Sequence, residues 1–370
     1  MDWRAASGAL DPQWRLYGRS ASDDKAPIVA MLTALDALQA AGKLPTANIK
    51  VLFDGEEERG SPHLRQIIAD NKQLLASDVV LFCDGPIHTS RRMQVYLGAR
   101  GEVGLELTVF GPLRPLHSGH YGNWAPNPAV ALAHLLASMR DEQGRVLIPG
   151  FHDDVRALTE EERAALSLLP DTETALRREL ALGRTEGDER LMNSIMRPAL
   201  NVRGLRAGDV GNAATNSIPT QAQASVDLRL VPEQTPDKVR GLVERFLEAQ
   251  GWFIVDREPD AATRQRHRKL LRVNWTLVYA PTRSDPSDPL VKQAIVAIEQ
   301  ALGRSILVVP MMGGSVPMDI FVEILRVPVI GVPIVNHDNN QHGANENVRL
   351  QNLWDGIEVY AGLMTGMDPR

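Results

Sequence analysis

The chain has 370 residues, a length that usually accommodates two domains, and 44% of its residues are hydrophobic, as in an ordinary globular protein. A formal net charge of −6, without a long run of Lys or Arg, argues against nucleic acid as a partner. No apolar stretch approaches the roughly 20 residues that cross a bilayer, so no membrane association is expected. The single cysteine, Cys83, excludes an internal disulfide, and the cytoplasm is the expected location.

The first part of the chain alternates predicted helices and strands, which is typical of an α/β domain. Apolar residues at helical spacing predict a helix over 27–41, which Gly42 ends. Short apolar runs predict strands over 49–53 and 79–83, on either side of a helix over 63–75. The same alternation returns after about residue 280, with helices predicted over 289–302, over 318–325 and from 350, and strands over 306–309 and 327–335.

A different pattern separates these two parts. Apolar residues alternate strictly from Val103 to Val109 and again from Ala222 to Leu230, which predicts half-exposed strands. With helices predicted over 128–138 and 236–249, they indicate a smaller α+β domain, and the charged, helix-prone segment 144–204 is interpreted as its elaboration. The predicted division is therefore 1–98 and 281–370 for a discontinuous outer domain, interrupted by an inserted domain over 99–280.

Three acidic clusters precede a predicted helix or follow predicted strands. Asp23 and Asp24 precede the first helix in LYGRSASDDKAP, where an N-cap is the ordinary interpretation and metal binding is the alternative. The run Glu56 to Glu58 follows a strand in LFDGEEERGS, and Asp84 follows another in VVLFCDGP, where a turn is the ordinary explanation. Ligands gather at the carboxyl ends of strands in α/β sheets, so two adjacent carboxylates there could act as a metal ligand and a general base.

Histidines in two loops are candidates for metal binding or catalysis. His342, in NQHGANENV after the last predicted strand, would supply the nitrogen ligand that zinc favours, with His337 as a competing choice that spacing does not exclude. His117 and His120 lie in PLHSGHYGN of the inserted domain, where the glycines argue against a helix. A loop histidine there could donate to a developing oxyanion, and a purely structural role is the alternative.

Read in order, GRSASDDK, DGEEERGS, Asp84, LHSGHYGN, NSIPTQAQASVDLRLVP, GGSVP and HGANENV resemble the M20 metallopeptidases, from about Trp14 to the C-terminus. LHSGHYG, RLVPEQTP and the long insert most resemble the branch of carnosine and cytosolic nonspecific dipeptidases. The resemblance implies a zinc aminopeptidase-like catalytic domain of the α/β class, incomplete at its N-terminus. It also implies that an α+β lid domain interrupts this domain and mediates homodimerisation.

The resemblance further implies residue roles. Asp23 would bridge two metal ions, Glu57 would be the general base, Glu58 and His342 would complete one metal's ligands, and Asp84 would bind the other metal. His117 would reach across the dimer to the scissile carbonyl in the neighbouring subunit. The residues implied to hold substrate are Asn216, Arg229, Gly314 and Ser315. The implied metal is zinc, two ions in the family, with Mn²⁺ or Co²⁺ as alternatives.

The implied reaction is hydrolysis of an amide bond in dipeptides or short acyl-amino acids, with N-acyl-amino-acid deacylation as the alternative. One departure from the family concerns an upstream His-x-Asp motif, because residues 1–22 contain no histidine and Trp3 resembles a tryptophan that follows this motif. We therefore expect about one zinc per chain and weak catalysis, or a non-catalytic dimeric remnant. A miscalled start or truncated reading frame is the expected origin.

Overall fold

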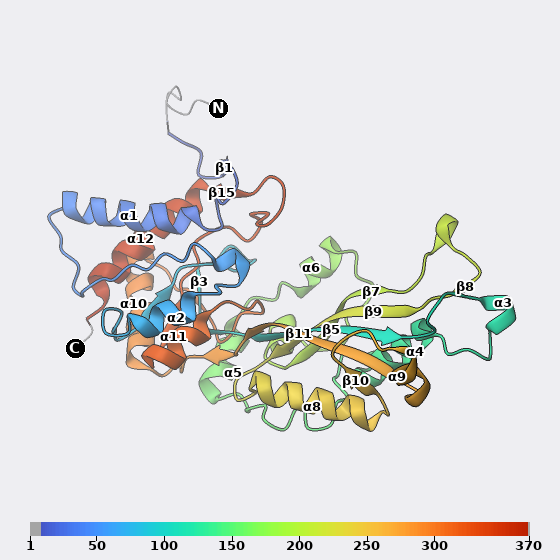
Figure 1. Ribbon diagram of the computed structural model, residues 1–370. Coiled ribbons are helices and arrows are strands. Elements are labelled where there is room, and N and C mark those ends of the chain that lie inside the picture. Colours follow the sequence, from blue (N-terminus) through green and yellow to red (C-terminus); the bar gives the residue numbers. More distant parts are fainter. Residues whose placement is uncertain (1–8, 369–370) are drawn as a thin grey trace.

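The computed structural model describes residues 9–368, and Trp3 lies outside them (Figure 1). One part of the molecule is built on a four-stranded sheet in the order β13-β3-β14-β2. β14 runs parallel to β2 and antiparallel to β3, whereas β13 runs parallel to β3. Residues from both ends of the chain thus share one sheet, whose strands are β2 (Val80–Phe82), β3 (Gln94–Tyr96), β13 (Leu307–Val309) and β14 (Val329–Gly331).

Helices cover both faces of this sheet. Small residues allow close packing on one face: Ala30 and Ala34 of α1 are fully buried, and a Cβ on Gly362 would lie 2.5 Å from that of Ala301. The helices on that face are α1 (Lys25–Ala40), α10 (Pro289–Leu302) and α12 (Leu350–Gly366). The other face is covered by α2 (Leu64–Asp70) and α11 (Met318–Leu325). This three-layer arrangement is the α/β class that the sequence predicts.

In this α/β part of the chain, three predicted elements differ clearly from the observed ones. Residues 49–53 form no strand, because no other described strand pairs with them, and Phe53 is 58% exposed. The predicted helix 63–75 ends at Asp70, where the Asn71 side chain donates to the Ile67 carbonyl oxygen at 2.9 Å. The strand predicted over 327–335 is limited to β14, since the backbone continues into the loop that carries His342.

A second sheet of five strands has the order β10-β11-β5-β9-β7 (Figure 1). Leu105 and Val226 are fully buried beneath the two helices that cover one face, α4 (Pro128–Met139) and α8 (Pro236–Ala249). Central β5 also buries Glu102 and Thr108 on the opposite face, so the predicted half-exposure is wrong for this strand. The strands are β5 (Gly101–Phe110), β7 (Ala199–Arg206), β9 (Gln221–Leu230), β10 (Phe253–Val255) and β11 (Leu270–Tyr279).

The segment 144–204 is only partly helical, contrary to its helix-prone prediction, because β7 begins at Ala199 and pairs with β9. Its helices are α5 (Glu160–Leu168), α6 (Glu173–Glu179) and α7 (Leu191–Ile195); the short α9 (Ala261–Arg266) precedes β11. Where the chain passes between the two sheets, β4 (Gly98–Ala99) and β12 (Thr282–Arg283) pair antiparallel. The boundaries at 98/99 and 280/281 stay a prediction. Among residues 9–368 no helix is both long and apolar enough to span a membrane.

Candidate metal centre

Three loops far apart in the sequence bring Asp23, Glu58 and His342 together. The Nε2 atom of His342 lies 3.0 Å from Asp23 Oδ2 and 3.0 Å from Glu58 Oε2. One ligand atom from each residue lies within 4.8 Å of the others. Two carboxylates and an imidazole at this spacing are a donor set that zinc accepts.

Asp23 is positioned by Glu346, a residue that the sequence did not single out. The Glu346 carboxylate is buried and accepts hydrogen bonds from the backbone N–H groups of Ser20, Ser22 and Asp23 at 2.8–3.1 Å. Asp24 occupies the N-cap position of α1, but its side chain makes no cap hydrogen bond. The capping interpretation of this acidic pair is therefore wrong.

The loop that carries His342 is closed at its base by buried polar side chains. Asn336 and Asn347 are at most 1% exposed and are joined by a 3.2 Å hydrogen bond. Strand β15 (Asn347–Arg349) pairs antiparallel with β1 (Arg15–Tyr17), which places two arginines beside Asp338 in the same loop. Arg349 Nη2 donates to both Asp338 carboxylate oxygens at 3.1 Å, and Arg15 also pairs with this carboxylate.

Asp338 makes the stability of this loop depend on pH. Burial opposes its ionisation, but hydrogen bonds from Arg15 and Asn336 and the charge of Arg349 outweigh burial and lower the pKa of Asp338 to about 2. Because the pKa of Asp338 is lower in the folded protein than in the unfolded one, the ionised carboxylate stabilises the fold at pH values above the unfolded pKa of 3.8. This stabilisation is lost as the pH falls through about 2. We expect Asp338→Asn to lower the free energy of unfolding by about 1–2 kcal/mol at pH 7, because hydrogen bonds to a charged group contribute about this much when partly exposed.

Urea denaturation at pH 7 and at pH 3 measures this effect, with Asp36→Asn as the control because Asp36 is an exposed acid on α1. The difference between wild type and Asp338→Asn is expected to shrink at the lower pH. A difference that is unchanged or larger at pH 3 would contradict the assigned role of the carboxylate.

Glu57 and Glu58 lie in a short 3₁₀ turn, Glu57–Arg59, which local hydrogen bonds fix. Asp54 accepts hydrogen bonds from the Glu56 backbone N–H at 2.9 Å and from the Ser61 hydroxyl at 2.6 Å. Gly60, with φ of 80°, ends the turn in the left-handed region that glycine adopts without strain. The turn thus presents two successive carboxylates in a fixed orientation.

Among residues 9–368, no lysine or arginine forms an ion pair with the acids of the cluster, whose ion-pair partner is His342. Burial, followed by the charge of Asp84, raises the pKa of Glu57 to about 7 and that of Asp24 to about 9. Burial and the charge of Asp23 raise the pKa of Asp84 to about 6. Asp24 Oδ1 is buried, and no group in the described part of the chain forms a hydrogen bond with it. Crowded acids that repel one another are the electrostatic environment that a divalent cation would stabilise, so the residues fit a metal ion.

The structure distinguishes between the two candidate histidines of this loop. His342 belongs to the acidic cluster, whereas His337 lies near His88, whose pKa is lowered by burial and by the charges of Arg92 and His337. His337 is therefore not the cluster's histidine.

Asp84 is not one of the three converging ligands, although its charge affects the pKa values of its acidic neighbours. It follows β2 and is mostly buried, and its carbonyl oxygen accepts a hydrogen bond from the Tyr96 hydroxyl at 2.9 Å. A Cβ on Gly331 would lie 2.1 Å from the Tyr96 ring, so a glycine is required for this contact.

His117 directly precedes α3 (Ser118–Tyr121), which lies at the end of the five-stranded sheet far from α1 and α12 (Figure 1). His117 ends β6 (Leu116–His117), which pairs with β8 (Ser217–Ile218), and the Asn216 carbonyl oxygen accepts a hydrogen bond from Ser118 at 2.9 Å. The prediction against a helix here is wrong, because His117 Nδ1 accepts from the Gly119 backbone N–H at 3.1 Å and caps α3.

Arg229 links the two parts of the molecule. Its Nη1 donates to the Ser315 hydroxyl at 2.8 Å, in the loop that includes Gly314, and lies 2.8 Å from Glu102 Oε2. Its Nε lies 2.6 Å from Asp227 Oδ2. The sequence did not single out Glu102 and Asp227, which compensate the charge of Arg229. Glu102 lies opposite Arg229 on β5 and cannot be paired with it from local spacing, whereas Asp227 lies two residues before Arg229 on β9.

A model of the peptidase family M20/M25/M40 matches residues 3–366. This chain belongs to the M20 peptidase family. Human β-Ala-His dipeptidase is 28% identical over 363 residues, which are 95% of this chain and 68% of the relative. The Cys-Gly metallodipeptidase DUG1 of Saccharomyces cerevisiae is 26% identical over 94% of this chain and 71% of its own length.

Solved structures confirm the fold class of this M20 peptidase. The metallo-carboxypeptidase Sso-CP2 from Sulfolobus solfataricus aligns with a TM-score of 0.83 and 29% identity, over 96% of this chain and 78% of that protein. The predicted α/β class and the predicted resemblance to M20 dipeptidases are therefore confirmed.

Proposed function

We propose that this M20 peptidase hydrolyses the amide bond of dipeptides or short acyl-amino acids at a metal centre built on Asp23, Glu58 and His342. The observation that carries the proposal is the convergence of these three side chains within 4.8 Å of one another. Relatives named as metallodipeptidases support a dipeptide as the substrate class.

Asp23, Glu58 and His342 would hold one divalent ion, and Asp23 with Asp84 would contribute to a second. The ion is zinc in this proposal, with Mn²⁺ or Co²⁺ as alternatives, and when bound it would acidify water and polarise the scissile carbonyl. The Glu57 carboxylate takes the proton of the attacking water and later donates it to the leaving amine. Burial and the charges of Asp84, Glu58 and Asp23 raise the pKa of Glu57, and a bound divalent ion would offset those charges.

Lid residues would hold the substrate. Arginine presents a planar fork that pairs bidentately with a carboxylate, which suits Arg229 to a substrate carboxyl group beside Gly314 and Ser315. His117 and Asn216 lie together at the far end of the lid and would act on a neighbouring subunit in a homodimer formed through the lid. Sedimentation that shows only a monomer at working concentrations would contradict this shared site.

The choice of substrate gives the test of the proposed function. We expect the zinc-loaded protein to hydrolyse an unblocked dipeptide at least about 10-fold more efficiently in kcat/KM than the matching N-acetyl amino acid, a difference of about 1.4 kcal/mol in transition-state stabilisation. Amine release measured for both compounds under the same conditions decides this. A clear preference for the acetylated compound would instead support the N-acyl-amino-acid deacylase alternative.

A further inference from the structure

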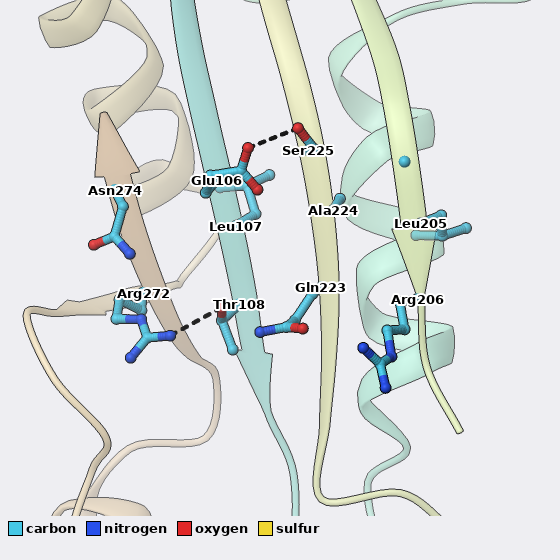
Figure 2. A pocket seen from close by; sticks show the side chains of 11 residues that line it. Glu106, Leu107, Thr108, Leu205, Arg206, Gln223, Ala224, Ser225, Arg272 and Asn274 are labelled. Atoms are coloured by element: carbon cyan, nitrogen blue, oxygen red, sulfur yellow. Dashed lines mark hydrogen bonds between the residues drawn. The ribbon is translucent and has the colours of Figure 1, made fainter. Parts of the chain in front are cut away.

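The five-stranded sheet has one open face, which is hollowed into a groove. Helices α4 and α8 cover the opposite face, and the groove of about 450 Å³ lies over β11, β5, β9 and β7 (Figure 2). This volume is within the range of small-molecule sites. Gly204 on β7, which pairs with Ser225 on β9, has no side chain that would fill the groove.

Polar side chains form one row across the four strands of the groove. In register, Arg272 pairs with Thr108, Thr108 with Gln223, and Gln223 with Arg206. Figure 2 shows the two arginines on opposite sides of the Thr108–Gln223 pair. Neighbouring strands are about 4.8 Å apart, so side chains as long as arginine can converge on one ligand from both ends of this row.

The two arginines of this row lack acidic partners. Within residues 9–368 neither Arg206 nor Arg272 forms an ion pair, and Arg272 Nε is buried without a hydrogen-bond partner. The polar contact of Arg272 is a 3.5 Å hydrogen bond to the Thr108 hydroxyl. By contrast, two other arginines of this sheet, Arg203 on β7 and Arg229 on β9, are paired with carboxylates.

The acid that also lines the groove does not compensate these charges. Glu106 lies in the next row, where it accepts a hydrogen bond from the Ser225 hydroxyl at 2.6 Å and lies 3.8 Å from Arg203 Nη2. The row of Arg272, Thr108, Gln223 and Arg206 therefore offers hydrogen-bond donors and two positive charges.

We propose that this groove is an anion site that binds a small molecule bearing a carboxylate or phosphate group. Guanidinium groups pair with both kinds of anion through parallel N–H donors, and the Thr108 hydroxyl and Gln223 amide add neutral donors between them. Gln223 lies six residues from Arg229 along β9, roughly 20 Å at the rise of a strand, so the groove is separate from Arg229. The inference does not depend on the proposed hydrolysis.

Calorimetric titration with inorganic phosphate and, separately, with succinate tests the site. At low salt and up to about 10 mM anion, a site with a millimolar Kd fills measurably. We expect one of the two anions to bind more tightly, which identifies the preferred group, and the double substitution Arg206→Gln with Arg272→Gln to weaken its binding at least 10-fold. Any phosphate that binds at the metal centre would bind equally to the wild type and to the variant. The difference in binding between the two proteins therefore measures binding in the groove.

The matched control is Arg114→Gln, because Arg114 is an exposed arginine elsewhere in the same inserted domain. Circular dichroism tests whether the variants are folded. If the double variant is not folded, the single substitution Arg206→Gln replaces it, because Arg206 is exposed and its substitution should not disturb the fold. Binding of neither anion, or equal binding in wild type and the folded arginine variant, would overturn the proposal.

Discussion

Glu57→Gln is expected to lower kcat for dipeptide hydrolysis by about two to four orders of magnitude, the contribution usual for a general base. Glutamine has nearly the same shape as glutamate but takes up no proton. Glu57 directly precedes the proposed ligand Glu58 and lies among the carboxylates of the metal centre, where it can accept a proton from water and return it. The zinc content, measured by elemental analysis, is expected to stay unchanged.

Glu56→Gln is the matched control. Glu56 precedes Glu57 in the chain, but its Oε2 lies 2.7 Å from His63 Nδ1 and outside the three-residue cluster. Its substitution is expected to change kcat by less than about 10-fold, a small effect beside the loss of a general base. Equal losses in the two variants would mean that the total charge of the loop matters, not a base at position 57.

His342→Ala is expected to weaken zinc binding by more than the roughly 10–100-fold that follows loss of an outer partner of a ligand, because it removes the nitrogen ligand itself. The remaining carboxylates, Asp23 and Glu58, leave a poor zinc site. Competition with a chelating dye measures the Kd directly and needs no turnover.

His337→Ala controls for this substitution, since His337 lies in the same loop but near His88. We expect it to retain the zinc affinity of wild type within a few-fold. If His337→Ala loses zinc and His342→Ala does not, the ligand assignment is wrong and the competing choice is correct.

Helices with local signals could be predicted closely from the sequence. The bounds of α8, α10 and α11 match their predictions, and α4 differs by one residue. Asp288 caps α10 through hydrogen bonds from Leu290 and Val291, and a proline follows the cap directly. Periodicity, a capping side chain and a first-turn proline are all local, so a short window of sequence contains them.

Strands were predicted less well, because pairing is not local. Residues 49–53 have a strand composition but no described neighbour to pair with, whereas β7 lies in a segment predicted to be helix-prone and pairs with β9. The prediction also missed β11, where Leu271, Val273 and Trp275 alternate with polar residues. That alternation was a usable signal.

The candidate ligands were predicted largely through the family resemblance, and the structure supplies what the resemblance did not. Glu346 contacts the loop before α1 across 323 or more residues of sequence, and no spacing rule anticipates such a contact. The burial of Asp24 Oδ1 and the pairing of Asp338 with two arginines are likewise visible only after folding. The roles of Asp23, Glu58, Asp84 and His342 in metal binding stay predictions.

Anomalous X-ray scattering at the zinc edge from zinc-loaded crystals tests most directly whether this chain builds a metal centre. The structure predicts an anomalous peak within about 2.0–2.2 Å of His342 Nε2 and of oxygens of Asp23 and Glu58, the bond lengths usual for zinc. No peak at this position in zinc-loaded crystals, or a peak beside His337 and His88 instead, would contradict the account.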